Sequence, residues 1–135
     1  MSLVNLIEFN PIGDERGNLI SIESEKSVPF NIKRAYYLYS LNSSLPRGFH
    51  AHKNLEQVAI CIAGSCKIIL DDGKQREEVE LSSPAQGLHI KSMIWREMGS
   101  FSNDCILLVL ANEYYQEDDY IRDYSDFVSA VKLDS

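Results

Sequence analysis

The chain has 135 residues, 44% of them hydrophobic and 10% aromatic, which is enough for one domain with a sizeable core and too apolar for a disordered protein. Its 20 acidic and 13 basic residues give a net charge of -7, which argues against a nucleic-acid ligand because a phosphate backbone is bound by a basic face. Neither a membrane-spanning apolar run nor a signal-peptide pattern is present in the sequence, so we expect a cytoplasmic protein that does not contact membranes.

Short runs rich in β-branched and aromatic residues recur between turn signals along the sequence. They cover residues 19–23, 34–41, 57–62, 66–70, 76–81, 87–91 and 105–111. Seven short strands of this kind predict an all-β sandwich or barrel. Since no repeat or linker interrupts them, we expect a single domain over residues 1–135.

Turn residues and the tail refine this prediction. Asp71-Asp72-Gly73 and Ala63-Gly64-Ser65 each lie between two predicted strands, and their glycines can adopt the positive φ that tight hairpins need. In the tail, apolar residues from Phe127 to Val131 recur at helical spacing, which predicts a short C-terminal helix that begins near Ser125.

The spacing of the three cysteines does not favour zinc binding or nucleophilic catalysis. Cys61, Cys66 and Cys105 lie among apolar residues and form no Cys-x-x-Cys pair. We therefore interpret them as reduced core thiols rather than as a zinc site or a nucleophile.

Positive charge gathers in one part of this acidic chain. Between Lys26 and Lys53 there are five basic residues and not one aspartate or glutamate. These residues are either a solvated surface or part of a pocket for a small anionic ligand such as a phosphate ester.

The histidines indicate where such a pocket lies. His50 and His52 stand two residues apart, so on a strand they point to the same face, and Glu56 shares their parity if the strand stays regular. His89, the remaining histidine, follows a turn and falls on another predicted strand. In a barrel these side chains face one cavity, so we expect the segment from Arg47 onward to form the active site.

This pattern resembles two families at different depths. The order His50-x-His52-x3-Glu56, Gly64, Pro84 and His89 resembles the two motifs of the cupin superfamily. The chain departs from these motifs at Ser44, where a glycine is usual, and at Met93, where an asparagine is usual.

A closer resemblance, to the dTDP-4-keto-6-deoxyglucose 3,4-ketoisomerases, covers nearly the whole chain. It is carried by Asp14-Glu-Arg-Gly17, Pro29-Phe-Asn-Ile-Lys-Arg34, Tyr36-Tyr37, Arg47-Gly-Phe-His-Ala-His-Lys53, Leu55-Glu-Gln57, Gly64-Ser-Cys66, Leu70-Asp-Asp-Gly73 and Asp119-Tyr-Ile-Arg-Asp-Tyr124. The resemblance implies an all-β cupin fold, a double-stranded β-helix or jelly-roll barrel, with the short C-terminal helix. It also implies a homodimer that exchanges N-terminal strands.

The activity that the resemblance implies is an isomerisation without metal, redox cofactor or other cofactor. The ketone of a dTDP-linked 4-keto-6-deoxyhexose moves from carbon 4 to carbon 3 through an enediol. The product would serve an aminotransferase that makes a 3-amino-deoxysugar for a surface glycan such as an O-antigen. Whether carbon 4 takes the gluco or galacto configuration, and whether the nucleotide is thymidine, stays open.

The resemblance also implies roles for individual residues. His52 would abstract and return the carbon-bound proton, and His50 would shuttle protons between the two oxygens, because imidazole exchanges protons near neutrality. Tyr37 would stabilise the enediolate, or else only pack in the barrel wall. Arg47 and Arg16 would bind the diphosphate, with Arg16 reaching a neighbouring subunit's site.

Further basic and aromatic residues are weaker candidates for substrate binding. Lys33, Arg34 and Lys53 could bind the substrate, or else be solvated or structural. Trp95 could stack on the base or sugar, although large aromatic side chains more often lie in a core or interface.

Three alternative functions remain. His50, His52, Glu56 and His89 are also the donor set of a metal-dependent cupin, and position 89 is not typically histidine in the ketoisomerases. A dTDP-sugar 3,5-epimerase shares the cupin fold and the Asp-x-Arg-Gly turn. A non-catalytic sugar-nucleotide-binding cupin would not need two histidines that face one point.

Overall fold

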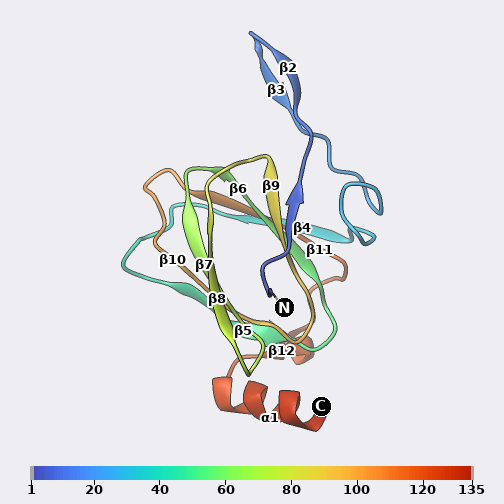
Figure 1. Cartoon of the computed structure of the whole chain (residues 1–135), viewed down its shortest axis with the longest axis vertical. Coiled ribbons are helices and arrows are strands. Elements are labelled where there is room, and N and C mark those ends of the chain that lie inside the picture. Colours follow the sequence, from blue (N-terminus) through green and yellow to red (C-terminus); the bar gives the residue numbers. More distant parts are fainter. Residues whose placement is uncertain (1, 135) are drawn as a thin grey trace.

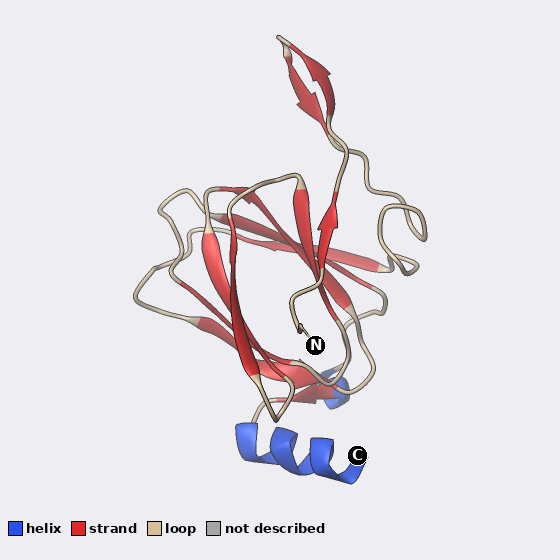
Figure 2. Cartoon of the chain, viewed as in Figure 1, coloured by secondary structure: helices blue, strands red, loops and turns tan. Residues whose placement is uncertain are grey.

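The computed structural model describes residues 2–134 and contains two five-stranded antiparallel sheets that face each other (Figures 1 and 2). The first sheet has, in spatial order, β1 (Leu6–Glu8), β9 (Gln86–Ile90), β6 (Gln57–Ala63), β11 (Ile106–Ala111) and β4 (Arg34–Leu38). The second has β12 (Tyr120–Ile121), β5 (Arg47–His52), β10 (Trp95–Gly99), β7 (Cys66–Asp71) and β8 (Arg76–Leu81). This all-β double sheet confirms the predicted fold class.

Alternation along each strand builds the main core between the two sheets. Ile68 and Leu70 of β7 point inward from the second sheet, and Leu107 and Val109 of β11 meet them from the first. All four side chains are at most 1% exposed. The barrel interior is therefore filled by side chains at this end.

Loop residues cover the outer face of the first sheet. Phe9, Val28 and Phe30 pack there against Val58 and Ile60 of β6. The predicted strand over residues 19–23 is wrong, because only its first residue is in a strand. Ile20 and Ile22 instead pack against this outer cluster. These apolar side chains therefore cover the face of the first sheet and do not belong to a strand.

The C-terminal helix α1 (Tyr124–Asp134) covers the outer face of the second sheet. Phe127 of α1 is fully buried against Trp95 and Ile121. The backbone N–H of Phe127 donates to the carbonyl of Asp123. The predicted helix, expected from about residue 125, is confirmed.

The two predicted glycine turns have different outcomes. Gly73, at φ +91°, lies in the turn between β7 and β8, which pair as a hairpin. Gly64, at φ +70°, instead connects β6 of the first sheet to β7 of the second. The prediction of a hairpin at Gly64 is wrong, because a glycine turn of this kind serves a crossover between sheets equally well.

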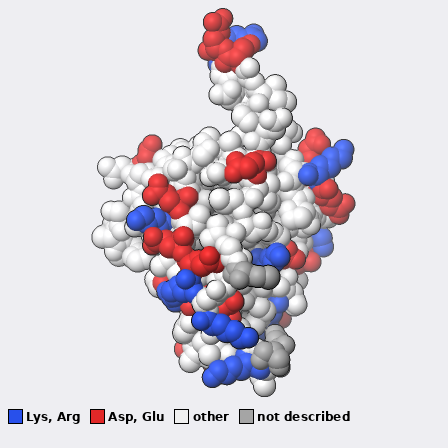
Figure 3. All heavy atoms as spheres, viewed as in Figure 1, with Lys and Arg blue, Asp and Glu red and all other residues white. Residues whose placement is uncertain are grey.

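A separate hairpin, β2 (Ile12–Asp14) and β3 (Gly17–Leu19), projects away from the barrel (Figure 1). Its tip is charged and its stem is uncharged, whereas charges of both signs are mixed over the body on the face that Figure 3 shows. Among the residues that the structure describes, no helix is long and apolar enough to cross a membrane.

Candidate active site

A bulge in β5 orients the histidine pair. Gly48 and Phe49 both have positive φ, +96° and +54°. Arg96 pairs with His50 while the next residue of β10 pairs with Gly48, so Phe49 is the extra residue. A bulge of this kind redirects the side chains that follow it. His50 and His52 then lie side by side, with ring centroids 4.9 Å apart.

The bulge also sets the tautomer of His50. Its Nδ1 lies 3.1 Å from the carbonyl oxygen of Gly48. A carbonyl only accepts hydrogen bonds, so Nδ1 carries the proton and Nε2 of the neutral ring has a free lone pair. This Nε2 is buried and has no hydrogen-bond partner among the described residues. It is therefore arranged as a proton acceptor.

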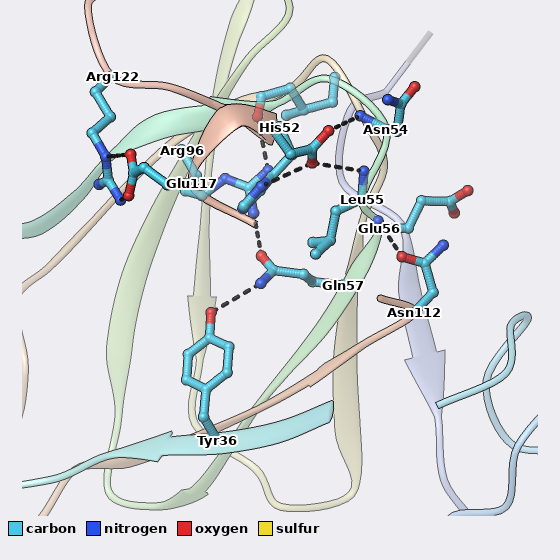
Figure 4. A network of polar contacts seen from close by, with 12 residues as sticks. Tyr36, His52, Asn54, Leu55, Glu56, Gln57, Arg96, Asn112, Glu117 and Arg122 are labelled. Carbon is cyan, nitrogen blue, oxygen red and sulfur yellow. Dashed lines mark hydrogen bonds and ion pairs between the residues drawn. The ribbon is translucent and has the colours of Figure 1, made fainter. Parts of the chain in front are cut away.

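His52 is fully buried behind His50. The Tyr120 ring lies 4.3 Å from its ring, and its Nδ1 lies 3.4 Å from Oδ2 of Asp119. The two groups are in close contact, but this Nδ1 has no hydrogen-bond partner among the described residues. Asp119, at the end of the short 3-10 helix η1 (Glu117–Asp119), accepts from the backbone N–H groups of Asn54 and Leu55 at 3.0 and 3.1 Å (Figure 4).

Both imidazoles are neutral at physiological pH. Burial, reinforced by the positive charge of Arg96, lowers the pKa of His50 to about 4. The same two causes, in the same order, lower the pKa of His52 to about 2. Each ring can therefore accept a proton, although neither holds it strongly in the protein alone.

Arg96 is the charged centre of a buried network that sequence reasoning missed. It is fully buried, its Nη1 donates to Oε1 of Gln57 at 2.5 Å, and its Nη2 donates to the carbonyl of Ile94 at 2.9 Å. Gln57 in turn donates from Nε2 to the hydroxyl of Tyr36 at 2.9 Å (Figure 4). Burial lowers the pKa of Arg96 to about 10, so it stays a cation at neutral pH.

A cavity of about 240 Å³ opens in front of His50. Its lining consists of Tyr36, Leu38, Arg47, Gly48, His50, Met98, Tyr120 and Arg122. Behind it, the guanidinium of Arg34 lies 5.2 Å from the centre of the Tyr36 ring. The cavity thus combines aromatic walls with several cations.

Unpaired buried polar atoms gather in this one region. Within residues 2–134 there are six of them, namely Nε and Nη2 of Arg34, Nε2 of His50, Nδ1 and Nε2 of His52, and Nε of Arg96. Buried polar groups in proteins are nearly always hydrogen-bonded, so such a cluster marks a functional site. The three guanidinium nitrogens are hydrogen-bond donors that suit an oxygen-rich, anionic ligand, whereas the unprotonated Nε2 of His50 is free to accept a proton.

The rim of the cavity carries a further cation. Glu117 accepts from Nε and Nη2 of Arg122 at 2.8 and 2.9 Å. The guanidinium of Arg122 also lies 4.1 Å from the centre of the Tyr120 ring. Arg122 and Arg47 therefore flank the entrance, and the sequence analysis had identified only Arg47.

Strand parity corrects two predicted site residues. Arg34, Tyr36 and Leu38 face the interior from β4, so Tyr37 faces outward with 64% of its surface exposed. Tyr37 therefore does not reach the cavity of its own chain, contrary to the prediction, and Tyr36 lines that cavity instead. On β10, Arg96 points inward, so Trp95 points outward.

The outward side of β10 explains the position of Trp95. Its ring packs against Tyr124 and Phe127 of α1, and its Nε1 donates to Glu97. The prediction that Trp95 stacks on the base or sugar is therefore wrong within this chain, since the side chain is buried beneath the helix.

Two other predicted substrate contacts lie away from the cavity of their own chain. Lys53 is exposed after the end of β5 and does not line the cavity. Arg16 lies at the tip of the projecting hairpin, 87% exposed and paired with Asp14 at 2.6 Å. Arg47 and Arg34 are the predicted arginines that the fold brings to the histidines.

The four residues of the alternative metal site do not converge. His89 points to the outer face of the first sheet, where its Nε2 lies 2.8 Å from Glu56 and its ring lies 6.1 Å from that of Phe30. In the described part of the chain, the one group of three or more potential ligands close enough to share an ion is a cysteine trio. His50 and His52 therefore lack the two further ligands predicted for them.

The chain is similar to proteins of one kind along nearly its whole length. The FdtA family model, described as WxcM-like, C-terminal, matches residues 2–132. The chain is 52% identical over 122 residues to a TDP-4-oxo-6-deoxy-alpha-D-glucose-3,4-oxoisomerase of Aneurinibacillus thermoaerophilus, which covers 90% of this chain and 88% of that enzyme.

Solved structures agree with this similarity. QdtA, a sugar 3,4-ketoisomerase from Thermoanaerobacterium thermosaccharolyticum crystallised with TDP, matches with a TM-score of 0.95 and 45% identity over 98% of this chain and 96% of that one. WlaRB, a TDP-quinovose 3,4-ketoisomerase from Campylobacter jejuni, matches with a TM-score of 0.91 and 47% identity over 96% and 99% of the two chains.

Proposed function

Because the chain belongs to the FdtA, WxcM-like family and is a sugar 3,4-ketoisomerase, we propose that it converts dTDP-4-keto-6-deoxyglucose into the 3-keto isomer with His50 and His52 as its proton-transfer groups. The observation that carries this proposal is the pair of neutral imidazoles, half-buried His50 and fully buried His52, whose Nε2 atoms are both buried without a hydrogen-bond partner among the described residues. The identity to the 3,4-oxoisomerase favours this function over a 3,5-epimerase, a metal-dependent cupin or a non-catalytic binding protein.

The reaction requires one carbon-bound proton and one oxygen-bound proton to move. The carbonyl at carbon 4 makes the proton at carbon 3 acidic, and a neutral imidazole removes it to give an enediolate. A proton then returns at carbon 4 while another passes from the oxygen on carbon 3 to the oxygen on carbon 4. No atom is gained or lost, so two adjacent acid–base groups suffice.

We assign the carbon-bound proton to His52 and the transfer between oxygens to His50. The contact between the two rings supports a shared task. His50 lines the cavity directly, whereas His52 lies behind it. Single variants of each residue test this division of labour through exchange of the carbon-3 proton with solvent.

Positive charge supports the enediolate. Arg96 is a buried cation held by neutral partners, Gln57 and the Ile94 carbonyl, so its charge is not cancelled locally. A preorganised charge in a water-poor site stabilises a developing anion far better than solvent does. The hydroxyl of Tyr36, which lines the same cavity, supplies a hydrogen-bond donor to the enediolate in the role that we had predicted for Tyr37.

The diphosphate of the nucleotide occupies the cationic entrance in this proposal. Arg47 and Arg122 flank the cavity, and Arg34 has two buried nitrogens free of partners. Guanidinium groups bind phosphate oxygens in pairs. Lys53 remains a candidate only for the outer part of the nucleotide.

We also propose a homodimer in which the β2–β3 hairpin contacts the partner subunit. Ile12 and Leu19, paired across this hairpin, are 68% and 59% exposed. An isolated two-stranded hairpin is marginally stable, and exposed apolar stems mark interfaces. The charged tip would then carry Arg16 to the partner's site.

The three free cysteines fit a reducing compartment such as the cytoplasm, where the product would enter synthesis of an amino sugar for a surface glycan such as an O-antigen.

The test of function is incubation with dTDP-4-keto-6-deoxyglucose in deuterated water. We expect a 3-keto product with one deuterium at carbon 4, and NMR coupling will give the configuration there. Unchanged substrate contradicts the proposal. The same assay after dialysis against EDTA should give the same rate, and a loss restored by one metal ion would instead support the metal-dependent alternative.

Histidine variants test the assignment. His50→Asn and His52→Asn should each lower kcat by roughly 10²- to 10⁴-fold while calorimetric TDP binding persists. His89→Asn is the matched control, because this histidine lies on the outer face beside Glu56. His89→Asn should leave kcat per folded molecule unchanged. Full activity in His50→Asn or His52→Asn would refute a proton-transfer role for the histidine replaced.

A further inference from the structure

Three thiols meet in the core, away from the cavity. Cys61 of β6, Cys66 of β7 and Cys105 just before β11 place their Sγ atoms within 4.8 Å of one another. The Sγ atoms of Cys61 and Cys105 are 3.6 Å apart. Each residue is at most 3% exposed. The group contains no histidine or carboxylate, so its chemistry is that of sulfur alone.

Its surroundings decide which ligand such a group can take. The thiols belong to the apolar core, beside Met98 and Phe101. Three thiolates around a divalent ion would leave a net negative charge in this apolar region, and burial of an unpaired charge is strongly unfavourable.

We propose that this trithiol cluster is a binding site for trivalent arsenic, taken up as arsenous acid. Neutral As(OH)₃ reacts with three neutral thiols to give As(SR)₃ and three waters. Three As–O bonds and three S–H bonds break, three As–S and three O–H bonds form, and arsenic stays trivalent. No net charge is created at any point, so the apolar core favours this ligand over zinc, copper or cadmium ions.

The topology predicts a consequence of binding. Cys61 and Cys105 lie on strands or turns of the first sheet, whereas Cys66 begins β7 of the second. One arsenic atom therefore ties the two sheets together at this end of the barrel. Cys61 stands four residues beyond Gln57 on β6, which is about 13 Å along a strand. The three cysteines are not part of the cavity lining, although Met98 of the same core cluster is.

Access to the site requires local opening. The cluster lies where the 63–65 connection meets the turn before β11, and the backbone N–H of Ser65 donates to Oγ of Ser102 there. Turns of this kind open more readily than the central strands. Uptake should therefore be slow but complete without global unfolding.

The test uses the reduced, folded protein with sodium arsenite. We expect one arsenic per chain by mass spectrometry, a sulfur-to-arsenic absorption band, a higher Tm and unchanged kcat. Cys66→Ser should bind arsenic roughly 10²-fold more weakly, since one of three linked attachments is lost, while its kcat stays at the wild-type level. Cys61→Ser serves as an independent second variant.

Three outcomes would overturn the proposal. The first is native protein that takes up no arsenic over hours although the urea-unfolded chain does. The second is equal affinity in Cys66→Ser, which would leave a two-thiol site only. The third is preferential binding of cadmium ion, which would contradict the charge argument. If the serine variants do not fold, X-ray absorption of the arsenic-loaded wild type decides, since three As–S and no As–O bonds are expected.

Discussion

Replacement of Gly48 by alanine tests whether the β5 bulge positions His50 and His52, the proposed catalytic pair. Gly48 has φ +96°, and a Cβ there would lie 3.0 Å from the carbonyl oxygen of Arg96. For a residue with a Cβ, a left-handed backbone costs about 1–2 kcal/mol. The variant should also lose activity, because the Gly48 carbonyl accepts the Nδ1–H that sets the tautomer of His50.

The expected loss of stability can be expressed as a change in Tm. A chain of this length has an unfolding entropy of about 0.28 kcal/mol/K, so 1–2 kcal/mol corresponds to a Tm lower by about 4–7 °C. Gly73→Ala is the matched control, since Gly73 has φ +91° and its added Cβ would meet only the Val131 side chain at 3.2 Å. Its Tm should fall by a similar amount.

The two variants separate strain from catalysis. Differential scanning calorimetry gives Tm, and the ketoisomerase assay gives kcat per folded molecule. We expect Gly48→Ala to lower kcat by at least tenfold, a loss that misplacement of one acid–base group would explain, while Gly73→Ala keeps the wild-type kcat. Equal kcat in both variants, with both Tm values lowered, would refute a positioning role for the bulge.

The same geometry makes five further predictions. Burial and Arg96 lower the pKa of His50 to about 4, so kcat/KM should stay constant from pH 8 to about pH 5 and fall only near pH 4. A fall in kcat/KM near pH 6.5, the pKa of a free histidine, would contradict the lowered pKa of His50. Stability should decline as the pH falls from about 6.5 to about 4, because the unfolded chain binds more protons in that window, which urea denaturation can measure. Tyr36→Phe should lower kcat on the order of 10²-fold through loss of a donor in the cavity, whereas Tyr37→Phe, at an outward position, should not. Asp119→Asn should change the ¹⁵N shifts of His52 and lower kcat more than it changes KM, and unchanged ¹⁵N shifts would remove the 3.4 Å contact from the mechanism. Phe127→Ala should lower the free energy of unfolding by about 3–5 kcal/mol, measured by chemical denaturation, because this side chain of α1 is fully buried against the sheet. Leu133→Ala is the control, since Leu133 is 87% exposed and its replacement should leave the free energy of unfolding unchanged.

Sequence periodicity predicted the strands that bury one face and expose the other. The β7 strand alternates inward Ile68 and Leu70 with outward residues, so its pattern is clear. The β10 strand was missed, because its sequence Trp-Arg-Glu-Met-Gly places a charged side chain at an inward position. The alternation rule expects an apolar residue at an inward strand position, so an arginine there argues against a strand. Functional sites break this rule because they need the buried charge.

The sequence also could not predict which of two neighbouring tyrosines on β4 faces the barrel interior. Tyr36 and Tyr37 are chemically identical neighbours, and period-two alternation places one inside and one outside without saying which. The register of β4 against β11, with Tyr37 opposite Leu108, decides it. The histidine pair escaped this ambiguity because His50 and His52 share one parity, and because the bulge adds its extra residue before them rather than between them.

The electrostatics of the cavity connect substrate binding with proton transfer. Burial, and after it the nearby cations, lowers the pKa values of the two imidazoles to about 4 and 2, which makes them poor proton acceptors. In the proposed complex a diphosphate would lie near Arg122 and Arg34, which are among the cations that lower these pKa values, and a nearby anion raises the pKa of an imidazole. The nucleotide, which takes no part in the chemistry, would thereby strengthen the base that acts on the sugar, so that binding energy remote from carbon 3 is used in the step at carbon 3.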